Sequence, residues 1–175
     1  MEADTTRVDR PVRIAVLTVS DSRTIDDDTS GDTLVDRLVS AGHALADRQL
    51  VGDDIYAIRA VASAWITDPT VEAIITTGGT GLTGRDGTPE AIAPLLDKEI
   101  EGFGEMFRFL SYETIGVSTL QSRALAGVAN STFVFCLPGS TGACKDGWDK
   151  LIADELDIGT GPCNLVELMG RLDEQ

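Results

Sequence analysis

The chain contains the segment Ala73-Ile-Ile-Thr-Thr-Gly-Gly-Thr-Gly-Leu-Thr-Gly-Arg-Asp-Gly-Thr-Pro-Glu90, in which an apolar run leads through five glycines to the start of a helix. The β-branched residues 73–77 are typical of a buried strand. We expect Thr88 to be the N-cap of the helix, with Pro89 at its first position. Open α/β proteins bind anions with this order of strand, glycine loop and helix N-terminus, because free N–H groups and the helix dipole converge there.

Asp86 lies inside this glycine loop. A carboxylate in a phosphate-binding loop is electrostatically costly unless a metal ion or a proton transfer makes use of it. The alternative is a tight turn between strand and helix with solvated polar side chains. Five glycines in ten residues are more than such a turn needs, so we predict a binding loop in which Asp86 has a chemical role.

The composition indicates one globular domain without a basic surface. The chain has 175 residues, of which 42% are hydrophobic, and its net charge is −15. Binding to nucleic acid or to an anionic membrane is not expected, because both need a basic face. The chain has no apolar run that could cross a bilayer and no signal-peptide pattern, so we predict a cytoplasmic protein. Three cysteines without paired spacing argue against a disulfide framework or a zinc site.

Apolar runs that alternate with amphipathic segments predict an α/β fold. Strands are expected at 12–19, 44–51, 73–77 and 132–137. Because helical patterns lie between them, right-handed crossovers should place these strands in a parallel sheet with helices on both faces. Residues 1–11 are expected to form a mobile arm, residues 12–156 the domain, and residues 157–175 a tail that packs on the domain or on a neighbouring subunit.

Helix boundaries in the second half of the chain are predicted from caps and glycines. The helix after the glycine loop should continue through Leu96, and Glu101-Gly-Phe-Gly-Glu105 should interrupt the helical pattern. Ser118-Thr-Leu-Gln121 has the spacing of a capping box and should begin another helix, which runs to Gly127. The apolar run 103–112 should fill the core or a contact between subunits, and we predict a homo-oligomer.

The first helix should begin at Ser30 or Asp32, after a polar loop that holds three aspartates at 26–28. We expect these aspartates to be solvated, and a cation site is the alternative. Cys144 follows the second glycine loop and could be a nucleophile of lowered pKa, but the single histidine leaves it without an evident base. That histidine, His43, is expected to have a role at a helix end or in a turn.

Four loops should meet at the edge where the parallel strands end, because ligands of open α/β sheets bind there. These loops are 18–23, 52–54, the first glycine loop and a second one, Pro138-Gly-Ser-Thr-Gly-Ala143. Neither glycine loop has a Walker A or a dinucleotide-binding pattern. Asp86 together with Asp53 or Asp54 could hold Mg²⁺ against a polyphosphate. The alternative for Asp53 or Asp54 is that it only caps the second helix.

Three motifs together resemble one protein family. They are Thr77-Gly-Gly-Thr-Gly81, Arg85-Asp86-x-Thr88-Pro89-Glu90, and Leu137-Pro-Gly-Ser140 before a helix. The combination is similar to the MoaB/Mog family of molybdenum cofactor biosynthesis, whose fold is that of molybdopterin adenylyltransferase, over about residues 12–156. The MoaB branch in particular is indicated by 101–105, 118–124 and Pro162-Cys163-Asn164.

The resemblance implies a three-layer α/β/α fold with a mainly parallel central sheet, and a homo-oligomer that is a trimer or a hexamer. It also implies that molybdopterin reacts with ATP, in the presence of Mg²⁺, to give adenylyl-molybdopterin and pyrophosphate. Asp86 and Asp53 match the family's two important aspartates and are expected to be catalytic and, through Mg²⁺, metal-binding. The implied substrate-binding residues are Ser20, Asp21, Thr77, Gly78, Gly79, Thr80, Gly81, Arg85, Thr88, Glu90, Pro138, Gly139 and Ser140.

Two alternatives to an active adenylyltransferase stay open. One is a catalytically silent paralogue that binds a pterin or a nucleotide, and the other is an oligomeric scaffold domain. Other proteins of molybdenum cofactor biosynthesis are possible partners in each case. The presence of both Asp53 and Asp86 favours the active enzyme.

Overall fold

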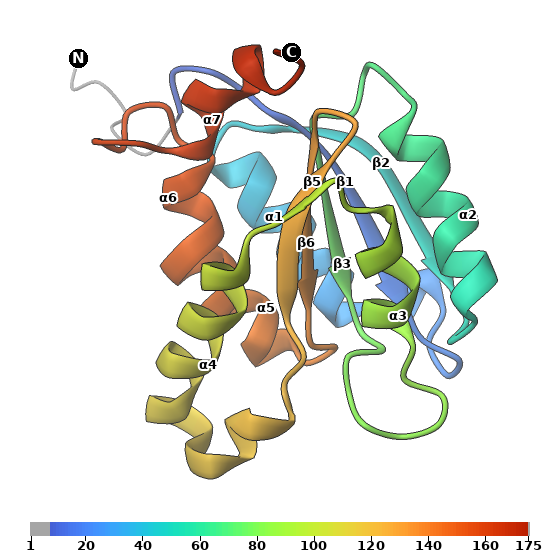
Figure 1. Cartoon of the computed structure of the whole chain (residues 1–175). Helices are drawn as coiled ribbons and strands as arrows, with labels where there is room; N and C mark the ends of the chain where they lie inside the picture. Colours follow the sequence, from blue (N-terminus) through green and yellow to red (C-terminus); the bar gives the residue numbers. More distant parts are fainter. Residues whose placement is uncertain (1–7, 175) are drawn as a thin grey trace.

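A six-stranded sheet forms the centre of the molecule, and helices cover both of its faces (Figure 1). This computed structural model describes residues 8–174. The strands are β1 (Arg13–Val19), β2 (Ala44–Val51), β3 (Ala73–Thr77), β4 (Lys98–Glu99), β5 (Leu125–Ala129) and β6 (Thr132–Leu137). The α-helices are α1 (Thr29–Ser40), α2 (Ile55–Ile66), α3 (Thr88–Ile92), α4 (Glu101–Ile115), α5 (Thr141–Gly147), α6 (Ala153–Glu155) and α7 (Leu165–Leu168). Short 3-10 helices lie at Ile25–Asp27, Ala93–Leu95, Gly116–Gln121 and Met169–Arg171, and a π-helical turn lies at Trp148–Ile152.

The strand order is β2-β1-β3-β6-β5-β4. The first four of these strands are parallel, whereas β5 is antiparallel to both β6 and β4. The three-layer fold with a mainly parallel central sheet is therefore confirmed. The antiparallel edge formed by β5 and β4 was not predicted. Because β5 runs antiparallel to β6, the residues before β5 lie at the edge of the sheet where the parallel strands end.

Alternate residues of the central strands face two separate hydrophobic clusters. Ile14 and Val16 of β1 pack with apolar residues of α1, α4 and α5, whereas Ala15 and Leu17 pack with those of α2 and α3. Figure 1 shows α2 and α3 on one side of the sheet and α1, α4 and α5 on the other. Because both faces are covered, β1, β3 and β6 are buried almost throughout, which explains their unbroken apolar sequences.

The prediction that Glu101–Glu105 interrupts a helix is wrong, because this segment forms the first part of α4. Gly104 looks like a helix breaker in the sequence, but here it permits a close approach. A Cβ at this position would lie 2.6 Å from the carbonyl oxygen of Ala124. The glycine therefore lets α4 pack against the chain that enters β5, with Phe103 and Phe107 buried beside it.

The helix predicted from Ser118 to Gly127 is also wrong. Residues Gly116–Gln121 form a 3-10 helix, and Gly127 belongs to strand β5. A turn of two residues, Asn130 and Ser131, joins β5 to β6, and their φ angles are 44° and 65°. Positive φ at both positions is typical of a tight hairpin turn, for which Asn-Gly is the usual sequence signal. The chain has Ser131 instead of glycine, so the hairpin is not evident from the sequence.

Helix α1 begins at Thr29, one residue before the predicted start at Ser30, and its N-cap is Asp28. The carboxylate of Asp28 accepts a hydrogen bond from the Gly31 amide at 2.9 Å. It is fully buried and not solvated, and it also contacts Thr18 Oγ1 at 2.6 Å and an Arg48 nitrogen at 2.9 Å. Asp28 therefore ties β1, β2 and α1 together beneath the loop that follows β1.

Helix α3 is shorter than predicted, since it ends at Ile92 and is followed by a 3-10 turn to Leu95. Its N-cap is Gly87, and Thr88 is already helical, so the predicted capping role of Thr88 is wrong. The Thr88 hydroxyl instead donates a hydrogen bond of 2.8 Å to the carbonyl of Gly78. This bond fastens the start of α3 to the first glycine loop.

The end of the chain contacts the main core through Val166 of α7, which is buried. Residues 1–7 of the predicted arm lie outside the described residues. Within residues 8–174, the helices include none that is both long enough and apolar enough to cross a membrane.

Candidate functional site

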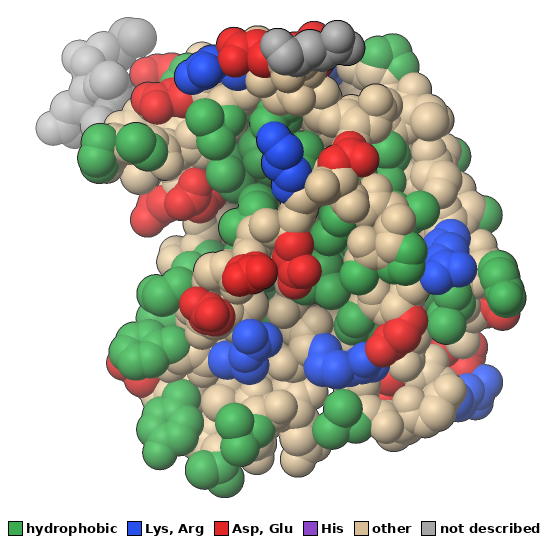
Figure 2. Space-filling view, in the orientation of Figure 1, with side chains coloured by type: hydrophobic (Ala, Val, Ile, Leu, Met, Phe, Trp, Pro, Cys, Tyr) green, Lys and Arg blue, Asp and Glu red, His purple; other side chains and the backbone are tan. Residues whose placement is uncertain are grey.

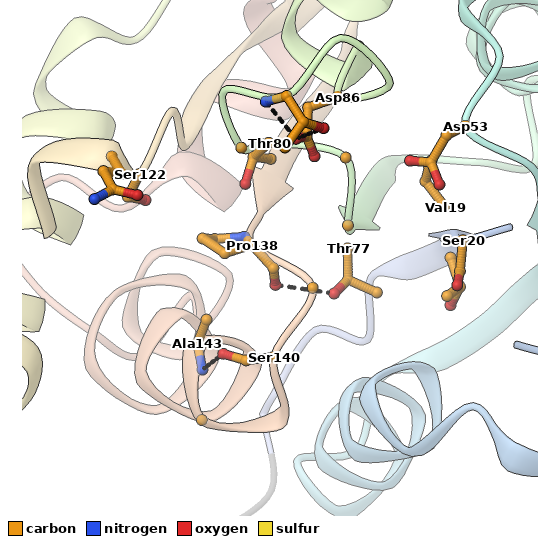
Figure 3. Close-up of a pocket in the computed structure, with 18 of the residues that line it drawn as sticks. Val19, Ser20, Asp53, Thr77, Thr80, Asp86, Ser122, Pro138, Ser140 and Ala143 are labelled. Atoms are coloured by element: carbon orange, nitrogen blue, oxygen red, sulfur yellow. Dashed lines mark hydrogen bonds between the residues drawn. The ribbon is translucent and has the colours of Figure 1, made fainter. Parts of the chain in front are cut away.

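A cavity of about 830 Å³ lies at the carboxyl ends of β1, β3 and β6. This is the edge at which open α/β sheets bind ligands. In Figure 3, Asp53 and Ser20 lie on one side of the view and Ser122 on the other, with Thr77 and Pro138 between them. Strand ends and their loops thus form one wall, and the segment around Ser122 forms the opposite wall.

The first glycine loop has a backbone that only glycine can adopt at its start. Gly78 has φ of 104°, and a Cβ there would lie 2.1 Å from the carbonyl oxygen of Val19. Gly79 also has positive φ, and the Thr88 amide donates a 3.0 Å hydrogen bond to the Gly79 carbonyl. The absence of side chains at these positions brings the loop backbone against the end of β1 and leaves it facing the cavity.

The side chain of Asp86 is hydrogen-bonded within the same loop. Its Oδ2 accepts hydrogen bonds from the amide of Thr83 at 2.9 Å and from the Thr83 hydroxyl at 2.6 Å. The hydroxyl contact is the main reason why the pKa of Asp86 lies below its usual range, with a contribution from the Gly81 amide. The carboxylate is therefore ionised at neutral pH and moves with its loop.

Asp53 comes from the loop after β2 and is paired with the loop after β1. The Asp53 amide donates to Asp21 Oδ1 at 2.9 Å, and the Asp21 amide donates to Asp53 Oδ2 at 3.1 Å. Arg85 of the glycine loop forms an ion pair with the other oxygen of Asp21. These three residues connect the three loops around one side of the cavity.

The pKa of Asp53 is raised, first by burial and then by the nearby negative charges of Asp21 and Asp86, and Arg85 offsets only part of this. Asp54 has a different role, since its side chain accepts a 2.7 Å hydrogen bond from the Ala57 amide and caps α2. The two aspartates, between which position in the loop alone left the choice open, are therefore distinct. Asp54 is the helix cap, and Asp53 faces the cavity with a charge that is only partly compensated.

The second glycine loop lies against the first. Gly139 packs on Gly78, and a Cβ on Gly139 would lie 3.0 Å from the Gly78 Cα. Ser140 caps α5 by accepting a hydrogen bond from the Ala143 amide at 3.1 Å, as Figure 3 shows. Thr77 donates to the Pro138 carbonyl at 3.1 Å, which fixes the spacing of the two loops.

Thirteen of the fifteen residues predicted for the site line the cavity: Ser20, Asp21, Asp53, Thr77, Gly78, Gly79, Thr80, Gly81, Arg85, Asp86, Pro138, Gly139 and Ser140. Thr88 and Glu90 do not line it. Thr88 is buried behind the glycine loop, and Glu90 forms an ion pair with Arg123.

The wall of the cavity that α4 and the following 3-10 helix provide was not predicted from the sequence. Its lining side chains include Phe107, Ser111, Thr114, Ser118, Gln121 and Ser122. These residues reach the site because β5 is antiparallel, so the residues before it lie at the edge where the parallel strands end. The only available signal was the hydroxyl and amide content of 118–122, which was interpreted as a helix cap.

Two weaker candidates have structural roles. Cys144 is buried, and burial raises the pKa of its thiol to about 11, so it is not a reactive thiolate at neutral pH. His43 is also buried, and its Nδ1 accepts a 3.2 Å hydrogen bond from the Val12 amide at the start of the sheet. Burial lowers the pKa of His43, which favours the neutral ring.

The acidic side chains of the cavity do not form a ready-made metal site. In the part of the chain that the structure describes, no three His, Cys, Asp or Glu side chains lie close enough together to hold a metal ion. Asp53 and Asp86 come from different loops, and Asp86 already accepts hydrogen bonds from Thr83. The donor set suits an ion that also has ligands from a bound nucleotide, because Mg²⁺ usually combines one or two carboxylates with phosphate oxygens and water.

Comparison with known proteins gives one consistent family. Residues 15–157 match a protein-family model described as "Probable molybdopterin binding domain". The chain is 56% identical to Molybdenum cofactor biosynthesis protein B of Escherichia coli (strain K12) over 154 residues, which are 88% of this chain and 91% of that protein. A crystal structure of Molybdenum cofactor biosynthesis protein B is 40% identical, with a TM-score of 0.85 and coverage of 95% of this chain and 98% of the other. The tungsten cofactor synthesizing protein MoaB from Pyrococcus furiosus is 35% identical, with a TM-score of 0.74 and coverage of 83% and 92%.

Proposed function

The chain belongs to the molybdenum cofactor biosynthesis family, in its MoaB branch, and from this premise we propose that it binds molybdopterin and adenylylates it with ATP and Mg²⁺. The products are adenylyl-molybdopterin and pyrophosphate. One observation carries the proposal. Asp53 and Asp86, from two different loops, face the same cavity as the backbone of two glycine loops.

The proposed reaction needs groups that hold phosphates in line. A phosphate oxygen of molybdopterin attacks the α-phosphorus of ATP, and the bond from that phosphorus to the bridging oxygen of the β-phosphate breaks. Pyrophosphate leaves with the electron pair of this bond. Catalysis of such a transfer consists mainly of positioning and charge stabilisation. The free N–H groups of the glycine loops are suited to bind phosphate oxygens.

Arg85 supplies an exposed positive charge to the lining of the cavity. Its side chain is 76% exposed and is paired with Asp21, which is itself bound to Asp53. A polyphosphate that enters the cavity competes with Asp21 for Arg85. If the Arg85 guanidinium leaves Asp21 and pairs with the phosphate, the carboxylates of Asp21 and Asp53 lose this cation. A second cation is then needed beside them.

Mg²⁺ meets this need. The raised pKa of Asp53 reflects burial and neighbouring carboxylates, which is the electrostatic environment that a bound cation relieves. Asp53 and Asp86 are the residues that would hold the ion together with phosphate oxygens. When bound, magnesium neutralises phosphate charge and polarises the reacting phosphoryl group.

We also propose that the chain forms a homo-oligomer, because an apolar stripe is exposed on α4 and the 3-10 helix after it. Phe109 is 68% exposed and Leu120 79%, and Met106, Tyr112 and Val117 are exposed beside them. Figure 2 shows apolar side chains gathered at the lower left, where Figure 1 places α4. An apolar patch of this kind usually marks a protein contact. This surface is the observation that favours the scaffold alternative, which does not exclude catalysis.

Pyrophosphate release with purified molybdopterin, ATP and Mg²⁺ tests the proposal. Wild-type protein should release pyrophosphate in an amount equal to the molybdopterin consumed, and omission of molybdopterin should stop the release. Tight binding of molybdopterin or ATP without any release of pyrophosphate would instead identify a silent paralogue. Failure to bind either compound would leave the scaffold alternative.

A further inference from the structure

We propose that Arg123 is a positioning residue, which fixes the first glycine loop over the cavity by holding both ends of that loop. Arg123 lies two residues before the start of β5 and does not line the cavity. The kinetic consequence of this inference rests on the proposed adenylyl transfer, but its structural consequence does not.

Arg123 donates hydrogen bonds to three main-chain carbonyls of the loop. Its Nε lies 3.2 Å from the carbonyl oxygen of Thr80 and 2.9 Å from that of Gly81. One terminal nitrogen, Nη2, lies 3.3 Å from the carbonyl oxygen of Asp86. Thr80 and Gly81 lie directly before the exposed residues 82–85 of the loop and Asp86 lies directly after them, so a single planar group joins the two ends of this exposed part.

Glu90 of α3 holds the same guanidinium from another side, through an ion pair with Nη1. The position of Arg123 itself is fixed by the hairpin, because β5 pairs with β6 in an antiparallel register that begins at Leu125 and Cys136. The planar fork of arginine matches this set of acceptors. A lysine ammonium is a compact point charge on a flexible stem and cannot reach the separated carbonyls with the same geometry.

The hydrogen bonds of Arg123 to the carbonyls of Thr80, Gly81 and Asp86 form a clamp on the loop. This clamp determines where Asp86 lies relative to Asp53. The Asp86 carboxylate is bound to Thr83 within the loop, so it moves with the loop as one unit. Asp53 belongs to the loop after β2 and has no hydrogen bond to Arg123. Loss of the clamp would therefore leave Asp53 in place and release Asp86, which separates the two carboxylates that the reaction needs together.

Arg59 provides a matched control. It also donates to main-chain carbonyls, with Nε at 3.2 Å from Ala91 and Nη2 at 2.7 Å from Glu90. These acceptors belong to helix α3, and Arg59 makes no hydrogen bond to the glycine loop. Truncation of Arg59 removes the same chemistry from the same neighbourhood without releasing the loop.

Hydrogen exchange of the free protein tests the clamp without any substrate. We expect Arg123→Ala to speed amide exchange in peptides that cover residues 79–87 by about tenfold, because charge-assisted hydrogen bonds that close the loop are lost. Arg59→Ala should leave these peptides unchanged, and neither variant should affect β1 or β3. Arg123→Lys should resemble Arg123→Ala. Added methylguanidine should slow the exchange of the Ala variant again.

Methylguanidine can reach the vacated position, because Arg123 also lines a second cavity of about 520 Å³, together with Pro89 and Arg108. In the pyrophosphate assay, both Arg123 variants should lose between about tenfold and a hundredfold in kcat/KM, a loss typical of a misplaced catalytic group. Methylguanidine should restore part of the activity of Arg123→Ala only.

The results separate the clamp from the proposed function. If wild-type protein releases no pyrophosphate, the proposed function fails, while the exchange measurement still decides the role of Arg123. The inference about Arg123 is overturned if loop exchange in Arg123→Ala equals that in Arg59→Ala, or if methylguanidine does not slow it.

Discussion

Asp53 and Asp86 face one cavity, but their surroundings shift their protonation in opposite directions. Burial and the charges of Asp21 and Asp86 raise the pKa of Asp53, whereas hydrogen bonds from Thr83 lower the pKa of Asp86. The Asp86 carboxylate is stabilised by its own loop, whereas the charge of Asp53 is only partly compensated by the Asp21 amide and by Arg85. Carboxylates whose surroundings shift their pKa values in a cavity are typical of functional sites.

Substitution of Asp53 by asparagine should stabilise the free protein at neutral pH. Because folding raises the pKa of Asp53, its contribution to stability is complete below the unfolded pKa near 3.8 and is lost as the pH rises through the folded pKa. Asp53→Asn removes this loss, so the free energy of unfolding at pH 7 should rise by on the order of 0.5 kcal/mol. Near pH 3 the variant and the wild type should be equal. Urea unfolding at both pH values measures this, and a less stable variant at pH 7 would show that Asp53 is structural.

Asp86→Asn should keep the fold but reduce turnover by a factor on the order of 10² or more, because a positioned charge is lost. Asp68→Asn is the matched control. Asp68 also accepts hydrogen bonds from a threonine amide and hydroxyl, those of Thr70, and its pKa is lowered for the same reason, but it lies outside the cavity. Turnover measured by pyrophosphate release should be normal in the control. Near-normal turnover in Asp86→Asn would remove Asp86 from the mechanism.

The residues of the glycine loops could be predicted because their chemistry is local. A glycine-rich segment after a buried strand places its own backbone at the sheet edge, whatever the rest of the chain does. The choice between Asp53 and Asp54 could not be made in this way. It depends on which carboxylate meets the Ala57 amide, and adjacent residues have the same sequence signal.

Helix α1 has a fully buried carboxylate, that of Asp28, as its N-cap. Burial alone would raise the pKa of Asp28, but hydrogen bonds from Thr18, Gly31 and Arg48 outweigh it, and the pKa is lowered. The stability that Asp28 contributes is therefore present above the unfolded pKa and is lost as the pH falls through the folded pKa. Arg48 also pairs with Asp32, so the cap connects β2 to α1.

Asp28→Asn should lower the free energy of unfolding by about 2–4 kcal/mol at pH 7, because it leaves Arg48 beside a neutral partner in a buried place. The loss should shrink as the pH falls below 3.8, the ordinary pKa of the carboxyl, because the stability that ionised Asp28 contributes is lost as the pH falls further. Asp26→Asn serves as the control, because Asp26 is an exposed neighbour and its substitution should change stability by less than about 0.5 kcal/mol. Equal effects of the two substitutions would contradict the role of the cap.

At the scale of elements, β1, β3 and β6 could be predicted because burial on both faces leaves an unbroken apolar sequence. Helix α4 and strand β5 could not. Gly104 has the same appearance whether it breaks a helix or lets a helix approach the Ala124 carbonyl, and only the tertiary contact distinguishes the two. The wall of the cavity around Ser122 depends on that contact and on the hairpin between β5 and β6, so it could not be predicted from the sequence either.

At the scale of the whole molecule, the exposed stripe on α4 predicts self-association. Phe109→Asp should place a charge in the subunit contact and convert the oligomer to smaller species at micromolar concentration, as measured by light scattering. Tyr56→Ser is the control, because Tyr56 is 75% exposed on α2 and is not part of the stripe. Its mass in solution should equal that of the wild type. A wild-type protein that is monomeric in both low and high salt would refute the assembly.

The net charge of −15 sets how the molecule should respond to ions. An acidic surface repels ATP, and Arg85 and the loop N–H groups cannot neutralise Asp53, Asp86 and the phosphates together. Calorimetric titration should therefore show ATP affinity that depends steeply on Mg²⁺ and less steeply in Asp53→Ala. Added monovalent salt should strengthen binding, because it screens the surface over a Debye length of about 10 Å at 0.1 M. The binding of adenosine, which has no phosphates, should change neither with Mg²⁺ nor with added salt.

ATP binding that is equally tight in EDTA would exclude Asp53 and Asp86 as metal ligands. ATP binding that weakens with added salt would show that local positive charge outweighs the acidic surface.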